Sequence, residues 1–321
     1  MSKSIHFLLT IILTMAIVMI SCQRGNQGDN SSQPTIALVM KTLNNPFFID
    51  MQAGAEEAAA ELGVQLLVQA AEREVDVEKQ MQIIENLIQR KVAAICVTPS
   101  GSKEIVPAIL KANKAGIPIL IIDTRVDEEM LIAATAKIAT FIGSDNIEGG
   151  RIAANFVVEQ LGGVGKIAIL EGIPGHETGD ARLSGFHEII DQLDGIEIAT
   201  SQTANWERDQ GFTVFQNMLQ SHPDIDALFA CSDLMALGAV EAIRAAGRTG
   251  DILVVGFDAL ADARDAILAG TMTGSVAQHP EDMGRKAIEN AKRLLDGAAI
   301  PATVPIQIEL ITRNKLSAKA D

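Results

Sequence analysis

Short apolar runs alternate with helix-length amphipathic stretches from Thr35 almost to the end of the chain. The runs are partly continuous in hydrophobicity, as in strands buried on both faces, and strand–helix alternation is typical of parallel sheets with helices on both faces. The predicted strands are residues 36–40, 64–68, 92–97, 117–122, 138–142, 167–170, 196–199, 225–230, 252–257 and 272–277. The predicted helices include residues 76–90, 104–115, 146–161, 208–220, 233–246 and 283–295.

About ten strands reach the upper limit for one open sheet, whereas two sheets of about five strands each form two compact lobes. The chain has 321 residues, which suits two lobes of ordinary size. We therefore predict the α/β fold class, with two doubly wound parallel sheets, each in its own lobe.

Ligands bind such sheets beyond the carboxyl ends of the strands. Hydrogen-bonding residues follow many of the apolar runs; they are Lys41, Thr98, Asp123, Ser144, Asp145, Glu171, Ser232, Asp233, Asp258 and Gln278. Helix N-caps also lie at this edge, and Asp145 and Asp233 are predicted to be N-caps. For the other residues a ligand-binding role and a structural role are equally open.

Acidic residues outnumber basic ones. The chain has 26 Lys and Arg against 41 Asp and Glu, a formal net charge of −15, and only 3% of its residues are aromatic. Binding to duplex nucleic acid needs a basic surface, and binding to single strands needs stacking aromatic side chains. The composition therefore argues against a nucleic-acid partner.

Motifs for catalysis and for cofactors are absent from the sequence. It has no phosphate-binding loop, no dinucleotide-binding glycine motif, no nucleophile elbow and no Cys/His cluster with zinc spacing. The His176–Glu177 and His187–Glu188 pairs also fail the zinc pattern. Asp123 and Asp258 could serve acid–base chemistry, but could equally accept hydrogen bonds from hydroxyl groups. We predict no catalytic residue, cofactor or metal, and no enzyme activity.

The N-terminus has the features of a secretory signal. Lys3 is followed by an uncharged apolar run over residues 7–20, which is shorter than the ~20 residues of a membrane span. Ser21 and Cys22 end the run in a way that resembles a bacterial lipobox, in which the cysteine is lipidated, although Met19 stands where a Leu is usual. Secretion without lipidation is the alternative.

The residues after Cys22 are polar and lack apolar periodicity, which predicts a flexible tether. We expect a signal peptide over residues 1–21 and a lipidated cysteine with its tether over residues 22–34. The predicted location is exported, with a lipid anchor at the cell envelope. Cys96 and Cys231 each end an apolar run and are predicted to be buried free thiols, because three distant cysteines cannot form a disulfide framework.

Several further segments carry a family resemblance; they are residues 42–48, 143–146, 182–186, 235–239, 254–258 and 276–280. Each segment alone is a weak signal, whereas all of them in this order and spacing are specific. From Thr35 to about Ile311 the chain resembles the ribose-type periplasmic sugar-binding proteins. These are the substrate receptors of ATP-driven (ABC-type) sugar importers.

The resemblance implies two doubly wound lobes that are joined by a three-strand hinge and close on the ligand. It places residues 35–144 and 279–307 in the N-terminal lobe, and residues 145–278 and 308–321 in the C-terminal lobe. The implied ligand is a monosaccharide or related polyol, and the implied partner is an ABC-type membrane permease. We expect the protein to be a monomer.

The resemblance also implies a ligand-binding set. Phe47, Phe48 and Trp206 match aromatic residues that cover the apolar faces of the sugar ring. The residues that match hydroxyl-binding positions are Asn45, Asp123, Arg182, Asp258 and Gln278. The predicted set is completed by Lys41, Thr98, Arg125, Ser144 and Ser232.

Some of these positions differ from the ribose binders. Lys41 stands in place of a small hydroxyl residue, Thr98 and Ser232 stand in place of Asn, and Thr124 separates Asp123 from Arg125. The shorter side chains leave room that the Lys41 donor fills. These differences predict a ligand other than ribose and leave a hexose, an amino sugar, a polyol and a sugar acid open.

Three other functions share features with this interpretation. A transcription regulator of the same fold needs an N-terminal helix-turn-helix of about sixty residues, but the signal-like segment and the tether occupy that place. A receptor that passes a sugar signal to a membrane kinase without transport would have the same binding lobes. An exported sugar-processing enzyme would use Asp123 and Asp258. We rank the import receptor first, the signalling receptor second and the enzyme third.

Overall fold

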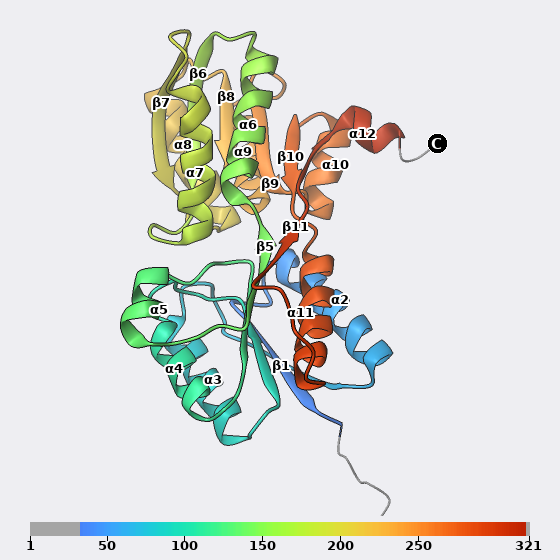
Figure 1. Cartoon of the computed structure of the whole chain (residues 1–321). Coiled ribbons are helices and arrows are strands. Elements are labelled where there is room, and N and C mark those ends of the chain that lie inside the picture. The colour runs from blue at the N-terminus through green and yellow to red at the C-terminus, as the bar shows by residue number, and fades with distance from the viewer. Residues whose placement is uncertain (1–32, 319–321) are drawn as a thin grey trace, which may run out of the picture. The chain divides into compact units, whose positions relative to one another are not determined.

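A computed structural model of the chain describes residues 33–318. The predicted signal peptide, Cys22 and most of the tether lie outside the described residues. Within the described range, twelve strands form two six-stranded sheets, and we call each sheet with its helices a lobe. Figure 1 shows the two lobes and the helices that cover them.

The first sheet has the strand order β11-β5-β4-β3-β1-β2, with every neighbouring pair parallel. The second has the order β12-β10-β9-β8-β6-β7 and is parallel except for the antiparallel pair β10–β12. The strands of the first sheet are β1 (Thr35–Met40), β2 (Gln65–Ala70), β3 (Ala94–Val97), β4 (Ile119–Ile122), β5 (Thr140–Ser144) and β11 (Thr303–Ile306). Those of the second are β6 (Gly165–Glu171), β7 (Ile196–Thr203), β8 (Ala227–Ala230), β9 (Leu253–Asp258), β10 (Gly274–Ala277) and β12 (Glu309–Thr312).

The helices of the first lobe are α2 (Pro46–Leu62), α3 (Val77–Gln89), α4 (Val106–Lys114), α5 (Glu128–Ala134) and α11 (Pro280–Leu295). Those of the second are α6 (Asn146–Leu161), α7 (Glu177–Ile190), α8 (Arg208–Ser221), α9 (Asp233–Ala245), α10 (Ala261–Ala269) and α12 (Arg313–Ala318). No helix in the described part of the chain is both long and apolar enough to span a membrane.

The α/β fold class with two doubly wound lobes is confirmed, but each sheet has one strand more than the five expected. The additional strands are β11 and β12, which join the two sheets as partners of β5 and β10. Both are only four residues long and largely half-buried or exposed, and β11 contains Pro305. A short, exposed edge strand lacks the continuous apolar run by which the buried strands are recognised.

The chain passes between the two sheets three times: from β5 to β6, from β10 to β11 and from β11 to β12. This agrees with a three-strand hinge. All strands up to Ser144 belong to the first sheet, and all strands from Gly165 to Ala277 belong to the second. The residue boundaries of the two lobes stay a prediction.

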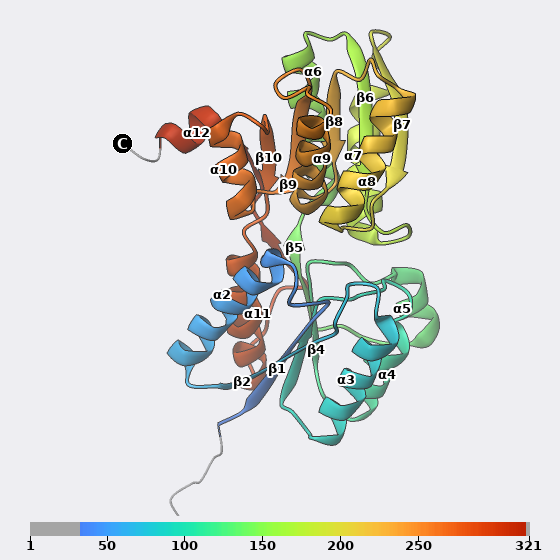
Figure 2. The same ribbon diagram turned by 180° about the vertical axis from the view of Figure 1, so that it is seen from behind.

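Helices cover both faces of each sheet. In the first lobe α2 and α11 lie on one face, and α3 and α4 on the other; in the second lobe α6 and α7 lie opposite α8 and α9 (Figures 1 and 2). Strand β1 shows how the sequence fits this layering, because Ile36, Leu38 and Met40 pack in one apolar cluster and Ala37 and Val39 in another. Side chains alternate between the faces of a strand, so a strand buried on both faces needs an apolar residue at every position.

Glycines let α2 and α11 pack closely. A Cβ atom at Gly54 would lie 2.0 Å from the carbonyl oxygen of Glu281, and one at Gly284 would lie 1.9 Å from that of Met51. Only a residue without a side chain fits at such crossings. The close packing holds the middle of α2 against the first turns of α11.

Candidate functional site

The strand order predicts a ligand-binding crevice in each of the two sheets. In each sheet the order reverses between the first strand and its neighbour, at β1/β3 in the first sheet and at β6/β8 in the second. A crevice forms outside the carboxyl ends of the strands at such a switch point. Lys41 and Thr98 follow β1 and β3, and Ser232 comes two residues after β8.

A cavity with about 310 Å³ of empty space lies where the two lobes meet, lined by residues from both. Ten predicted ligand-binding residues line it: Lys41, Asn45, Phe47, Phe48, Asp123, Arg182, Trp206, Ser232, Asp258 and Gln278. Most of the predicted set therefore surrounds one cavity.

Aromatic side chains form part of the cavity wall. The rings of Phe47 and Phe48 meet edge to face, with centroids 5.3 Å apart and planes at 89°. Asn45 fixes their position, because its Oδ1 accepts a hydrogen bond from the Phe47 backbone N–H at 3.0 Å and so caps α2. The third ring, Trp206, comes from the loop before α8 and packs against Gly172, where a Cβ would lie 2.0 Å from the indole.

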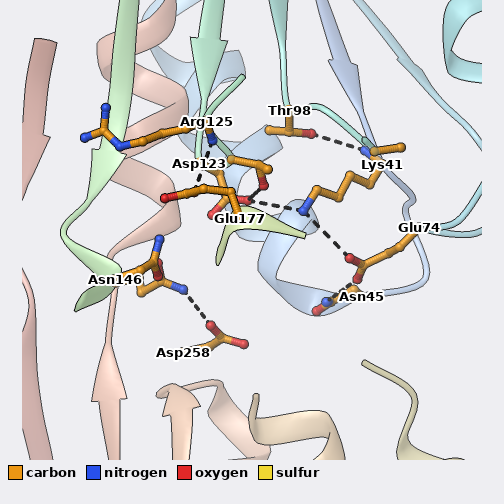
Figure 3. A network of polar contacts seen from close by, with 12 residues as sticks. Lys41, Asn45, Glu74, Thr98, Asp123, Arg125, Asn146, Glu177 and Asp258 are labelled. Atoms are coloured by element: carbon orange, nitrogen blue, oxygen red, sulfur yellow. Dashed lines mark hydrogen bonds and ion pairs between the residues drawn. The ribbon is translucent and has the colours of Figure 1, made fainter. Parts of the chain in front are cut away.

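A buried lysine lies between two carboxylates on the first-lobe side (Figure 3). Lys41 Nζ lies 3.5 Å from Asp123 Oδ2 and 4.0 Å from Glu74 Oε2. The other Glu74 oxygen accepts a hydrogen bond from Asn45 Nδ2 at 3.0 Å. Burial raises the pKa of Glu74, and the Lys41 ammonium opposes that rise. This side of the cavity therefore presents a cation and two acceptors within reach of one another.

An arginine and a carboxylate lie together on the second-lobe side. Arg182 Nη1 donates to the Cys231 carbonyl at 2.6 Å, and Nε donates to Asn146 Oδ1 at 2.9 Å. Its guanidinium also stacks over the Phe257 ring at 3.9 Å. The same Nη1 lies 3.7 Å from Asp258. These contacts fix the guanidinium at the cavity wall.

Asp258 is an acid with a strongly perturbed pKa at the wall of the cavity. Burial raises its pKa to about 7, although the Arg182 charge and a 2.7 Å hydrogen bond from Gln278 Nε2 oppose the rise. Asp258 has a φ of +111° and Asp123 a φ of +64°. Such backbone conformations cost free energy in a non-glycine residue and are concentrated at functional sites. The cavity wall thus contains two aspartates with a strained backbone, one from each lobe.

Two buried polar atoms at the cavity have no hydrogen-bond partner within the described residues. They are Gln278 Oε1, an acceptor, and Trp206 Nε1, a donor. A buried polar atom without a partner is unfavourable unless a ligand or water satisfies it. Together with the charged groups, these atoms can donate hydrogen bonds to some ligand hydroxyl groups and accept them from others.

Residues 36–299 match the periplasmic binding protein domain family. The chain is 37% identical over 312 residues to the ribose import binding protein RbsB of Bacillus subtilis (strain 168), a match that covers 95% of this chain and 98% of that protein. The chain belongs to the ribose-type periplasmic sugar-binding proteins of ABC importers. It is also 35% identical over 271 residues to the D-allose-binding periplasmic protein of Escherichia coli (strain K12), covering 84% of this chain and 86% of that protein.

A solved structure supports the same assignment. The periplasmic solute-binding protein of an ABC transporter from Actinobacillus succinogenes 130z, with bound D-allose, aligns with a TM-score of 0.86 and 39% sequence identity. The alignment covers 89% of this chain and all of that one. The family resemblance inferred from the sequence motifs is therefore confirmed, and membership of this family implies an exported protein.

Three predicted ligand residues of this sugar-binding protein do not line the cavity. Thr98 is fully buried and its Oγ1 accepts a hydrogen bond from the Lys41 backbone N–H at 3.2 Å, so it orients the loop that carries Lys41. Arg125 lies over the Phe141 ring at 3.8 Å. Arg125 and Ser144 line a neighbouring hollow instead.

Two cavity residues were not predicted: Glu74 and Thr178. Glu74 lies in the loop after β2, where Glu72 and Asp76 are equally acidic, so spacing along the chain does not single it out. Thr178 lies in the first turn of α7. Its sequence context shows no feature beyond a helix start.

The two N-cap predictions have different outcomes. Asp145 caps α6 by accepting from the Glu148 backbone N–H at 3.0 Å, as predicted. Asp233 was wrongly predicted, because Ser232 is the N-cap of α9 and Asp233 is the first helical residue. The Asp233 carboxylate instead accepts from Leu260 N at 2.8 Å and Ser275 Oγ at 2.7 Å. These bonds tie α9 to the loop after Asp258 and to β10.

The described residues show no group of three or more His, Cys, Asp and Glu side chains arranged to hold a metal ion. Cys96 and Cys231 are buried free thiols, as predicted. Burial raises the pKa of each thiol to about 12. Neither thiol is therefore a thiolate at neutral pH.

Proposed function

We propose that this protein captures one monosaccharide or related polyol in the cavity between its lobes and delivers it to the membrane permease of an ABC importer. The observation that carries this proposal is the composition of the cavity wall. Aromatic rings from both lobes supply apolar faces, and buried charged groups supply donors and acceptors around them. A sugar ring has the matching chemistry, with apolar C–H faces and hydroxyl groups at its edge.

The ligand is an uncharged sugar larger than ribose. The cavity wall carries two cations, Lys41 and Arg182, and three carboxyl groups, Glu74, Asp123 and Asp258. This near balance of charge does not favour an anionic ligand. The ribose binders have a small hydroxyl residue at the position of Lys41. The Lys41 ammonium gives this cavity an additional hydrogen-bond donor, which supports a ligand with an additional hydroxyl group, such as a hexose. The D-allose that is bound in the Actinobacillus structure is a hexose and is a suitable first probe.

A thermal-shift screen with sugars and polyols tests the proposal, with D-allose and D-ribose as the first probes. Saturating ligand stabilises the folded state by RT ln(1 + [L]/Kd), about 4 kcal/mol at a thousand-fold excess over Kd. Small-angle scattering with and without the best ligand then tests closure, because a ligand that contacts both lobes favours the closed form. A screen in which no sugar raises the unfolding temperature would contradict the proposal.

Transport without signalling and without catalysis is part of the proposal. The Bacillus subtilis relative is a ribose import binding protein, which supports transport over the signalling receptor. Incubation of the purified protein with the bound sugar, followed by product analysis, tests for turnover. We expect the sugar to be recovered unchanged and the protein to be a monomer by light scattering.

Anchoring through a lipid on Cys22 is a separate proposal, supported by the lipobox-like residues that precede this cysteine. Cys22→Ser should move the protein from the membrane fraction to the soluble exported fraction. Cys96→Ser is the matched control, because this thiol is buried in the first lobe. Recovery of the wild-type protein entirely in the soluble fraction would contradict the anchor.

A further inference from the structure

A short segment at the start of α7 connects the second lobe to the first, beside the cavity but outside its wall. Glu177 is the first residue of α7, and its Oε2 accepts a hydrogen bond from the backbone N–H of Arg125 at 3.3 Å (Figure 3). Arg125 belongs to the loop after β4 of the first lobe. The next residue in α7, Thr178, does line the cavity. The contact between the lobes is therefore one residue away from the ligand site.

The preceding residue makes a second contact between the lobes. His176 is 7% exposed and lies beside the backbone of Ser100, in the loop after β3. Burial and, to a smaller extent, the nearby Lys41 ammonium lower the pKa of His176 to about 4, so the ring is neutral at neutral pH. A neutral ring can be buried between the lobes without the desolvation cost of an ion.

The first-lobe groups that receive these residues are held in place by other contacts. Ser100 N donates to Gln80 Oε1 at 2.8 Å, and Gln80 Nε2 donates to the Thr98 carbonyl at 2.8 Å. The Arg125 guanidinium is held over the Phe141 ring. Both receiving loops thus have supporting contacts within the first lobe.

We propose that Glu177, with His176 beside it, is an interlobe positioning residue that holds the two lobes around the ligand and sets how fast the ligand leaves. The proposal rests on the proposed function. Glu177 makes its contact to the opposite lobe only when the lobes are together, so it stabilises that form without touching the ligand. A ligand that needs both lobes must wait for this contact to break before it dissociates.

The test compares Glu177→Ala with two other variants at the same helix. Asp180→Ala removes another acid from the first turn of α7, so it controls for the effect of charge on the helix N-terminus. Glu177→Gln keeps an oxygen that can accept from Arg125 N–H. Stopped-flow fluorescence of Trp206, the single tryptophan of the chain, measures association and dissociation of D-allose and D-ribose.

We expect Glu177→Ala to raise the dissociation rate roughly 5–10-fold and to leave the association rate within about twofold, as for the loss of one charge-assisted hydrogen bond. Asp180→Ala should match the wild type, and Glu177→Gln should recover most of the loss. A dissociation rate of Glu177→Ala equal to that of the wild type, or an equal increase in Asp180→Ala, would overturn the proposal.

A second measurement reads the contact without ligand. Hydrogen exchange of the Arg125 backbone amide, followed by NMR, should be faster in Glu177→Ala than in the wild type and in Asp180→Ala. If neither sugar binds the wild-type protein, the sugar assignment fails while faster exchange still supports the interlobe contact. Equal exchange rates in Glu177→Ala and the wild type would overturn it whatever the ligand.

Discussion

Arg182 and Asp258 face each other at the cavity wall with Nη1 and Oδ1 3.7 Å apart, and both side chains are buried. The guanidinium does not depend on this carboxylate, because it also donates to the Cys231 carbonyl and to Asn146. The Asp258 carboxylate is less well stabilised than the guanidinium, because burial raises the pKa of Asp258 to about 7 despite the nearby arginine. Burial of the Asp258 carboxyl group therefore costs stability in the ligand-free protein, at the wall where we propose that the group binds the sugar.

Asp258→Ala should weaken sugar binding by at least about tenfold, because hydrogen bonds to a charged acceptor in a closed site contribute ~1.5–3 kcal/mol each. Its unfolding temperature should equal or exceed that of the wild type, since Arg182 keeps its other partners. Calorimetric titration with D-allose and thermal unfolding measure the two effects. His187→Ala is the control, because His187 is exposed on α7 and pairs with Asp191. Wild-type affinity in Asp258→Ala would show that the ligand does not use this carboxylate.

The raised pKa of Asp258 predicts a pH dependence of stability. The folded-state pKa is about 7 and the ordinary value is 3.8, so the folded protein binds the proton more tightly than the unfolded chain does. The contribution of Asp258 to stability is therefore fully present below pH ~4 and is lost as the pH rises to about 7. Urea unfolding of the wild type and of Asp258→Asn at several pH values measures it. Relative to Asp258→Asn, the unfolding free energy of the wild type should fall by between about 1 and 4 kcal/mol from pH 4 to pH 7. A constant difference would contradict the prediction.

Asn45 has two separable roles. Its Oδ1 caps α2, and its Nδ2 donates to Glu74. Asn45→Ala should lower the unfolding free energy by about 1 kcal/mol through loss of the cap, whereas Asn45→Ser keeps a capping oxygen and should lose less. Both variants should bind sugar more weakly, because Glu74 loses its amide partner. Urea unfolding and calorimetric titration separate the roles; equal stability of Asn45→Ala and the wild type would rule out a stabilising cap.

Gly172 determines the position of Trp206. Gly172→Ala would place a Cβ 2.0 Å from the indole, so the ring must move and its fluorescence emission should shift. We expect sugar affinity to fall by more than about tenfold, because the ring covers one side of the cavity. Gly101→Ala is the matched control, since its new Cβ would meet only the side chain of Glu104, which can rotate away. Unchanged emission and affinity in Gly172→Ala would remove Trp206 from the proposed site.

The sequence predicted much of the site because sequence position and spatial position coincide at the carboxyl ends of parallel strands. Lys41, Asp123, Asp258 and Gln278 each follow an apolar run, and the sheets bring them to one edge. Thr98 follows a run as well, yet its hydroxyl turns to the Lys41 backbone. The direction of a side chain at a strand end depends on the local backbone, which a hydrophobic pattern does not encode.

The sequence by itself determined the strand–helix alternation, the two-lobe α/β fold and the family, since these depend on the periodicity of apolar residues and on ordered motifs. Only the tertiary structure decided which acid shares the cavity with Lys41, because Glu74 resembles its acidic neighbours in the chain and differs from them in burial alone. It also decided that Ser232 rather than Asp233 caps α9, and that Glu177 contacts Arg125 across the lobes. Contacts between residues far apart in the chain depend on the packing of whole elements, and no local pattern of residue types specifies them.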